Sequence, residues 1–245
     1  MNRLECIKSM VSKCKIAADI GTDHGYVAEM LLTENICEKI IATDLNKGPL
    51  NSAIEHLKNK SLFNKCDFRL GSGLEVLKDN EVDAIIIAGM GGDLISDILE
   101  MRKKIALNAS QLILQPMTHV DKLRKYLLQN GFSIIDENIV KEFHHYYFII
   151  KAVPNNLNNL NNLNNLNENN LQEENEIYYE ISKHLLRKND NIFIDYINKQ
   201  IHINNKIIKS LKNTNNLEYK EKITALTNKN KQLEELIKFE IKRNN

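Results

Sequence analysis

The chain has 245 residues, with 33 Lys and Arg against 32 Asp and Glu, and a formal net charge of +1. This length accommodates one large domain, or a domain of about 150 residues with a smaller appendage. Residues 1–153 carry 19 basic and 20 acidic residues, and residues 154–245 carry 14 and 12. Neither part is a polycation, so bulk charge does not require a nucleic-acid partner, and any phosphate contact would have to come from a local basic patch.

The cysteines and the apolar runs favour a cytoplasmic protein. No Cys-x-x-Cys pair and no His at zinc-finger spacing accompanies the cysteines, so we expect free thiols in a reducing compartment and no metal site. The start, Met1 to Glu5, has no apolar leader, and no uncharged apolar run is long enough to span a bilayer. A soluble protein of the cytoplasm is therefore expected. The four cysteines are Cys6, Cys14, Cys37 and Cys66.

Apolar runs of strand length alternate with segments of helical periodicity in the first half of the chain. The strands are predicted over 16–20, 39–43, 82–88 and 111–115, and the helices that follow them over 26–32, 49–59, 93–103 and 120–129. This alternation predicts an α/β fold, in which a parallel sheet carries helices on both faces. Two further apolar segments, 132–140 and 143–153, are separated by Lys141-Glu142 and predict an antiparallel hairpin that ends the sheet.

The composition changes after residue 153 and predicts three parts. Residues 1–153 have the composition of a globular domain. Residues 154–175 are rich in Asn with Leu at every third position, which fits neither a helix nor a strand and predicts a solvated, disordered linker. In residues 176–245, helical patterns over 177–186, 192–211 and 217–241 predict a coiled-coil-like helical domain. A packing arm or a dimer contact is an equally open interpretation of these helices.

Acidic and glycine-bearing turns follow the predicted strands in an ordered series. Each turn follows an apolar run that we interpret as a strand. The turns are Asp19 to Gly25, Asp44, Gly71 to Gly73, and Ala88 to Gly92. Turns at the carboxyl ends of parallel strands lie along one edge of a sheet, where open α/β folds hold nucleoside-bearing ligands. The series therefore predicts such a site.

The first turn differs from a dinucleotide-binding loop. Its glycines, Gly21 and Gly25, permit positive φ and close approach of the backbone, but they do not form a Gly-x-Gly-x-x-Gly motif. Asp23 within the turn would repel a pyrophosphate and could hold an ammonium group. Asp44, at the end of the second strand, is placed to accept ribose hydroxyls. Alternatively, it caps the helix that opens near Gly48-Pro49.

These residues resemble a known family. The segments ADIGTDHGY, ATDLNKGPL, RLGSGLEVL, IAGMGGDLI and LILQP are similar to those of the bacterial tRNA (adenine-22-N1)-methyltransferases. The resemblance covers about residues 4–153 and, more loosely, the helical tail. It implies a Rossmann-like, class I S-adenosylmethionine-dependent methyltransferase domain, with a helical pair that helps to grip tRNA. A methyltransferase with another substrate, and a non-catalytic RNA-binding protein of the same fold, are the alternatives.

The resemblance also implies a cofactor site. The first turn would hold the methionine part, Asp44 with the adjoining Leu45 the ribose, the third turn would flank the adenine, and the fourth would lie near the methyl group. The residues expected to bind S-adenosylmethionine are Asp19, Gly21, Thr22, Asp23, His24, Gly25, Asp44, Leu45, Gly71, Ser72, Gly73, Ala88, Gly89, Met90 and Gly91.

Two residues depart from the pattern of the family. Ser72 stands where the family more often has Asp, so a carboxylate contact to the adenine amino group is lost or replaced by a hydroxyl. Met117 stands where relatives often carry Asn, so an amide that could touch the target base is absent. Gln115 then remains as a candidate partner for the base edge, unless it only bonds to backbone at the strand end.

Methylation of adenine N1 requires little acid or base catalysis, because the lone pair is available and the sulfonium donor is activated. Positioning should dominate. The methylated base becomes cationic, so a carboxylate that stabilises the developing charge would help. Asp23 is the candidate for this catalytic role, and the alternative is that it caps the following helix.

Reaching N1 of a base within folded tRNA requires turning that base out of its stack. The protein must therefore hold the RNA outside the pocket as well. Three local basic clusters could do so, although each can equally be a solvated face. They are Arg102-Lys103-Lys104, the group Lys122, Arg124 and Lys125, and the group Lys206, Lys209 and Lys212.

Overall fold

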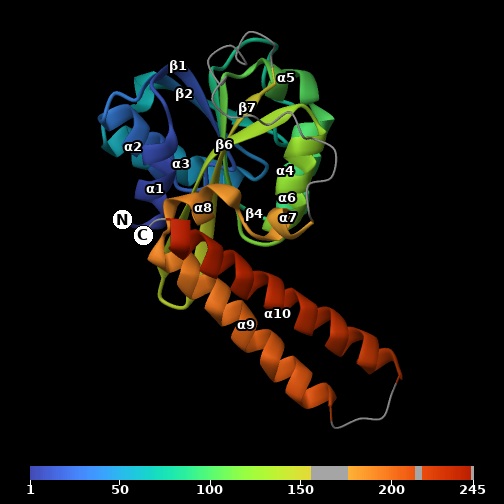
Figure 1. The fold of residues 1–245 in the computed structure, drawn as a ribbon. Helices are drawn as coiled ribbons and strands as arrows, with labels where there is room; N and C mark the ends of the chain where they lie inside the picture. The colour runs from blue at the N-terminus through green and yellow to red at the C-terminus, as the bar shows by residue number, and fades with distance from the viewer. Residues whose placement is uncertain (156–175, 213–216, 244–245) are drawn as a thin grey trace. The chain divides into compact units, whose positions relative to one another are not determined.

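The structure is a computed structural model that describes residues 1–155, 176–212 and 217–243. The chain separates into two compact units, Met1–Glu180 and Ile181–Asn245, and each is considered by itself (Figure 1). The linker predicted over 154–175 falls almost wholly outside the described residues. The three predicted domain boundaries remain predictions.

The first unit is built on one seven-stranded sheet with the order β3-β2-β1-β4-β5-β7-β6. All neighbouring pairs among β1 to β5 are parallel, and β7 is antiparallel to both β5 and β6. The predicted α/β fold with a terminal antiparallel hairpin is confirmed. The strands are β1 (Cys14–Ile20), β2 (Cys37–Asp44), β3 (Cys66–Leu70), β4 (Ala84–Met90), β5 (Gln111–Pro116), β6 (Phe132–Glu142) and β7 (His145–Pro154).

Helices cover both faces of this sheet because its central strands are apolar on both sides (Figure 1). Consecutive residues of β1 point to opposite faces. Ala17 belongs to the core cluster that contains residues of α1 to α3, and Ala18 belongs to the cluster that contains residues of α4 to α6. One face carries α1 (Arg3–Met10), α2 (Tyr26–Thr33) and α3 (Lys47–Asn59). The other carries α4 (Gly92–Met101), α5 (Lys103–Asn108) and α6 (Val120–Gln129).

Three details of the first unit differ from the sequence prediction. The strand before Gly71 is not an apolar run but the alternating edge strand β3, with exposed Asp67. The helix predicted over 93–103 is divided at Arg102 into α4 and α5. The hairpin turn lies at Phe143-His144 and not at Lys141-Glu142, which still belongs to β6. Polar residues of an exposed hairpin can continue a ladder, so polarity alone did not locate the turn.

Helix α1 was not predicted. It begins with a capping box: the Asn2 side chain accepts from the Glu5 amide (2.9 Å), and the Glu5 carboxylate accepts from the Asn2 amide (2.7 Å). Its apolar face, with Cys6, Ile7 and Met10, is buried in the same core cluster as β5 and β7 residues. The cap and this packing place Arg3 in the first turn of the helix.

Arg124 of α6 is buried, contrary to the prediction that it belongs to an RNA-binding cluster. Its side chain and that of Glu137 in β6 are 2% and 1% exposed. Arg124 Nε and Nη2 donate to Glu137 at 3.0 and 2.9 Å, and Nη1 donates to the carbonyls of Tyr179 and Glu180 at 2.8 and 3.0 Å. The guanidinium therefore holds the end of α7 (Ile177–Glu180) against the sheet domain.

The second unit contains α8 (Lys183–Lys188), α9 (Asn191–Leu211) and α10 (Leu217–Arg243). The helix predicted over 177–186 is interrupted, and α8 begins after Ser182, whose hydroxyl accepts from the Leu185 amide (3.2 Å). Helices α9 and α10 form an antiparallel pair (Figure 1). Between them, buried Asn204 donates to Asn230 (2.8 Å), and a polar pair of this kind fixes the register of two packed helices.

We predict that Arg124→Met destabilises the protein by about 3 to 5 kcal/mol, because it removes the guanidinium partner from the buried Glu137 carboxylate. Urea unfolding followed by circular dichroism measures the change. Lys125→Met is the matched control, since Lys125 is the exposed neighbour on the same helix, and it should cost less than about 1 kcal/mol. Equal small losses for the two variants would show that the buried ion pair does not stabilise the fold.

Candidate active site

A cavity of about 720 Å³ opens at the carboxyl ends of the parallel strands. It forms where the strand order reverses between β1 and β4, which is the usual ligand position in open α/β sheets. Of the described residues, those expected to bind the cofactor and found in its lining are Asp19, Gly21, Thr22, Asp23, His24, Asp44, Leu45, Gly71, Ser72, Gly73, Ala88, Gly89 and Met90. Gly25, Gly91 and Gln115 are not in this lining.

The turn after β1 is tied to the end of β2. The amides of Gly21 and Thr22 both donate to the Thr43 carbonyl, at 2.9 and 2.8 Å. Gly21 has φ +73°, and a Cβ there would lie 2.4 Å from Met90 Cε, so only glycine fits without displacement. Gly25 begins α2, and its Cβ position would press on Leu57 and Ala53 of α3. Its role in the structure is to let these helices pack closely.

Asp19 carries a buried carboxyl at the start of this turn. It is 4% exposed and accepts a hydrogen bond from the Thr22 hydroxyl (2.7 Å). The pKa of Asp19 is raised to about 6. Burial is the largest cause, the charge of Asp44 adds to it, and the hydrogen bond from Thr22 acts in the opposite direction. The negative charge is therefore held at a cost, which a cation in the cavity would offset.

Asp44 supports the loop after β2 and also faces the cavity. Its Oδ1 accepts from the Asn46 amide (2.9 Å), and Asn46 is the N-cap residue of α3. The alternative that Asp44 itself caps the helix is therefore wrong. The side chain lines the cavity and is 9% exposed, while the next residue, Leu45, lines it with 66% exposure. A carboxylate and an apolar surface are thus presented side by side.

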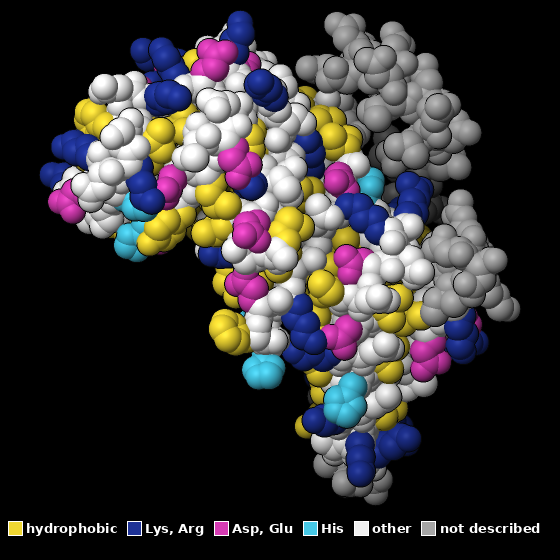
Figure 2. Space-filling model, turned by 90° about the vertical axis from the view of Figure 1, so that its left-hand side faces the viewer, with side chains coloured by type: hydrophobic (Ala, Val, Ile, Leu, Met, Phe, Trp, Pro, Cys, Tyr) yellow, Lys and Arg dark blue, Asp and Glu magenta, His cyan; other side chains and the backbone are white. Residues whose placement is uncertain are grey.

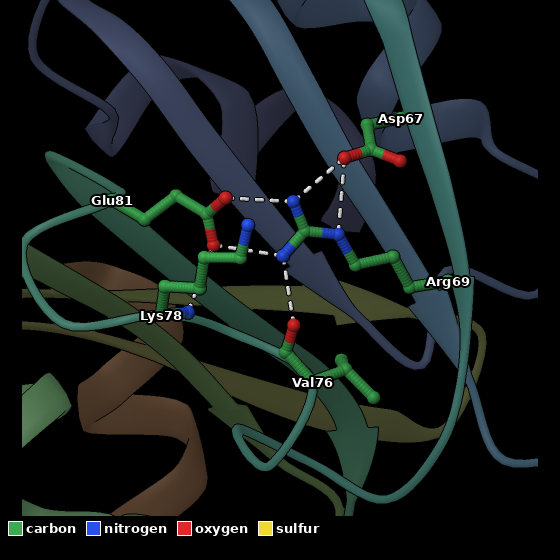
Figure 3. A network of polar contacts seen from close by, with 5 residues as sticks. All are labelled: Asp67, Arg69, Val76, Lys78 and Glu81. Carbon is green, nitrogen blue, oxygen red and sulfur yellow. Dashed lines mark hydrogen bonds and ion pairs between the residues drawn. The ribbon is translucent and has the colours of Figure 1, made fainter.

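A network around Arg69 holds the loop that follows β3 (Figure 3). Arg69 donates to both oxygens of Glu81 at 2.7 Å and to the Val76 carbonyl at 2.7 Å, and it also pairs with Asp67. The guanidinium lowers the pKa of Glu81 to about 2. Val76 in turn contacts Gly71, where a Cβ would lie 2.2 Å from Val76 Cγ1. Sequence reasoning missed this network, which fixes the loop bearing the cavity residues Ser72 and Gly73.

One buried hydroxyl in the cavity lining lacks a partner. Thr43 is 1% exposed, and its Oγ1 makes no hydrogen bond within the described part of the chain. A buried hydroxyl without a partner is costly, and such groups are normally satisfied. No described residue offsets this cost at Thr43.

Gln115 at the end of β5 does not present its amide to the cavity. It is fully buried, and its Oε1 accepts from the Gly89 amide (3.1 Å) and from Arg3 Nη1 (2.9 Å). Its Nε2 donates to the Pro116 carbonyl (2.9 Å) and lies 3.6 Å from Met117 Sδ. The amide is fully used within the protein, as expected for a strand-end Gln that bonds to backbone. Contact of Gln115 with the target base stays a prediction.

Asp23 remains available in the cavity lining. Its φ is +51°, a conformation that Asp tolerates better than most residues, and its side chain is 67% exposed. The Nε2 atom of His24 lies 3.6 Å from Asp23 Oδ1. Helix α2 is capped by Gly25 without any side-chain bond, so the alternative that Asp23 is an N-cap is wrong. A role of Asp23 toward a ligand is still a prediction.

Comparison with known proteins identifies the family. Residues 1–150 match the family model described as a methyltransferase domain. The chain belongs to the methyltransferase-domain family. The resemblance to tRNA adenine-N1 methyltransferases that the motifs indicate is confirmed as well. Over 150 residues the chain is 36% identical to the tRNA (adenine(22)-N(1))-methyltransferase of Bacillus subtilis, a match that covers 61% of this chain and 63% of that protein.

Solved structures of methyltransferases extend the similarity to the helical unit. A Bacillus subtilis enzyme described as the N1-methyladenine-22 tRNA methyltransferase TrmK has a TM-score of 0.81 and 26% identity, covering 96% of this chain and 97% of that one. TrmK of M. capricolum, solved with the cofactor product S-adenosyl-homocysteine, has a TM-score of 0.77 and 25% identity, covering 97% and 98%. The sequence match to the curated relative spans less than two thirds of its length, whereas the structural match is nearly complete.

The described residues contain no group of three or more His, Cys, Asp or Glu side chains arranged to hold a metal ion. None of the described helices is both long enough and apolar enough to cross a bilayer.

We predict that Asp19→Asn stabilises the unliganded methyltransferase at neutral pH. Because folding raises the pKa of Asp19 from 3.8 to about 6, the wild type loses stability as the pH rises through this range, and the variant does not. The difference between them should be near zero at pH 4 and reach up to about 3 kcal/mol above pH 6. Urea unfolding between pH 4 and pH 8 measures it.

Asp97→Asn, an exposed carboxylate outside the cavity lining, is the control and should show no such growth with pH. A flat difference for Asp19→Asn would mean that the fold does not oppose the charge of Asp19.

Proposed function

We propose that this methyltransferase transfers a methyl group from S-adenosylmethionine to N1 of adenine 22 in tRNA. The observation that carries the proposal is the near full-length structural similarity, at 26% identity, to an enzyme described as carrying out this modification. The cavity chemistry supports it independently, because carboxylates stand where a cationic, ribose-bearing ligand would bind.

The residues of the cavity fit S-adenosylmethionine. When bound, this cofactor supplies an electrophilic methyl group on a sulfonium. Asp19, with its pKa raised by burial, would hold the cationic methionine end, and Asp44 would accept the ribose hydroxyls. Ser72 would bond to the adenine edge by its hydroxyl, without the charge assistance of an Asp.

The protein's own contribution to the reaction is mainly positional. Adenine N1 carries a free lone pair, so no side chain has to remove a proton before the methyl group moves. The turn after β1 and the loop after β3 are each held by backbone bonds, which keeps the cavity walls in place. Asp23 would stabilise the positive charge that develops on the base, an interaction that is stronger in the transition state than before it.

Contacts to the tRNA must be local. On the face shown in Figure 2, basic and acidic side chains are interspersed and form no continuous basic surface. Of the predicted clusters, Arg124 is buried and Lys122 pairs with Asp93 (3.1 Å). Lys206, Lys209 and Lys212 of the helical unit are exposed, and we propose that they bind the RNA backbone. A tRNA substrate also implies the expected cytoplasmic location.

The proposal predicts methyl transfer to adenine 22 when the protein is incubated with labelled S-adenosylmethionine and an unmodified tRNA transcript. Methylation of N1 blocks the Watson–Crick edge, so a reverse-transcription stop maps the position. A transcript with guanine at position 22 is the control and should accept no label. Transfer to another position, or to a protein in place of the tRNA, would contradict the proposed substrate. Cofactor binding without transfer would favour a non-catalytic RNA-binding protein.

For Asp23, we predict that Asp23→Asn lowers kcat tenfold or more while the affinity for the cofactor changes less than about threefold. Asn tolerates the positive φ at this position, so the variant removes the charge without straining the turn. Single-turnover methylation measures the chemical step, and calorimetry measures cofactor affinity. Unchanged turnover would exclude Asp23 from catalysis.

A further inference from the structure

Arg3 is the one Lys or Arg among the described residues that line the cavity. The acidic members of the lining are Asp19, Asp23 and Asp44. Such a cavity suits a cationic cofactor and repels the phosphates of an RNA strand. An RNA nucleotide that enters it therefore has one position in the lining where its phosphate meets a positive charge.

The contacts of Arg3 fix its guanidinium without neutralising it. Nη1 donates to Gln115 Oε1 (2.9 Å) and lies 3.9 Å from Met117 Sδ, and the guanidinium stands over the Tyr147 ring at 5.4 Å from its centroid. The Glu142 carboxylate accepts from the backbone amide of Arg3 (2.5 Å), not from its side chain. No carboxylate in the described residues lies within ion-pair distance of the guanidinium. Its remaining donors can therefore bind an anion.

Arg3 stands at the opposite end of the cavity from the residues expected to hold the cofactor's nucleoside. Its partners belong to β5, β7 and their connections, and its Nη1 lies 3.8 Å from the position of a Cβ on Gly89 at the end of β4. The ribose and adenine residues, Asp44 and Ser72, follow β2 and β3, beyond β1 in the sheet order. Arg3 thus lies on the β4–β5 side, where the fourth turn is expected to face the methyl group.

We infer that Arg3 binds a phosphate next to the target nucleotide and so positions the base at the mouth of the cavity. This inference rests on the proposed function. A phosphate suits Arg3 better than the base does, because N1 must keep its lone pair and becomes cationic, and a guanidinium beside it would oppose that charge. Arg presents a planar set of donors that matches phosphate oxygens, and the contacts with Gln115 and Tyr147 orient it in advance. Gln115 then acts as a positioning residue through Arg3.

The test compares Arg3→Gln and Arg3→Lys with the unaltered full chain. Affinity for tRNA, measured by fluorescence anisotropy, should fall about 10- to 100-fold in Arg3→Gln and less in Arg3→Lys, which keeps the charge but not the fork of donors. The slope of log affinity against log salt should become shallower by about 0.7 to 0.9 in Arg3→Gln, as expected for one lost phosphate contact. Affinity for S-adenosylmethionine, measured by calorimetry, should stay within about twofold.

A tRNA with one uncharged methylphosphonate at either phosphate flanking adenine 22 identifies the contact. At the phosphate that Arg3 binds, this change should weaken binding to the unaltered protein about tenfold or more and have little further effect on Arg3→Gln. Additive losses at both positions would overturn the inference. Lys8→Gln, which removes a cation from the same helix outside the cavity, is the control and should bind tRNA like the unaltered protein.

Two outcomes distinguish this inference from a cofactor-binding role of Arg3 and from failure of the proposed function. If Arg3→Gln loses cofactor affinity and keeps tRNA affinity, Arg3 holds the carboxylate of the cofactor, and the inference is wrong. If the unaltered protein transfers no methyl group to tRNA, the proposed function fails, while the anisotropy and salt measurements still decide whether Arg3 contacts RNA phosphate. A thermal melt of each variant checks that loss of binding is not loss of fold.

Discussion

Backbone hydrogen bonds beyond the strand ends set the geometry of the whole active site. The Thr43 carbonyl at the end of β2 accepts from both Gly21 and Thr22, and the Asp44 carbonyl accepts from Gly71 (2.9 Å). On the other side, the Met90 carbonyl at the end of β4 accepts from Met117 (2.7 Å). These bonds tie the loops after β1, β3 and β5 to the ends of neighbouring strands, so side chains on three different loops keep fixed positions. A cavity with walls of this kind can orient two reactants without a rearrangement of its backbone.

The same geometry forces an electrostatic cost on the unliganded protein. The buried end of β1 carries Asp19, and Asp44 lies close enough on the neighbouring strand to raise the pKa of Asp19 further. Thr43 adds a buried hydroxyl without a partner in the described residues. A fold selected only for stability would place apolar groups there. The two carboxylates, Asp19 and Asp44, are better understood as part of the binding surface of a cationic ligand, whose binding offsets the energy that they cost.

Local sequence patterns predicted most of the sheet domain, and they failed where distant residues decide. Helix α6 and the apolar central strands follow from periodicity, because each of them buries a face that the local pattern defines. Arg124 lies in a basic stretch that the sequence suggests is solvated, and Glu137 and the carbonyls at the end of α7 explain its burial. Arg3 lies within a capping box, and the Asn2 and Glu5 residues that form this box are a recognisable helix start in the sequence. Its place in the cavity, however, depends on how α1 packs across β5 and β7.

The distribution of charge in the cavity resolves a conflict in the proposed reaction. A pocket that attracts a sulfonium must be acidic, yet the other reactant is a polyanion, and the chain as a whole carries a formal charge of only +1. A uniformly basic surface would help the RNA and weaken binding of the cofactor. Separation within one cavity satisfies both demands: the carboxylates lie at the carboxyl ends of β1 and β2 and in the turn after β1, and the guanidinium of Arg3 lies near the ends of β4 and β5. In the proposed reaction, the methylated base becomes cationic between Arg3 and the carboxylates. Arg3 would attract the RNA phosphate at one end of the cavity, and the carboxylates would stabilise the positive charge of the base at the other.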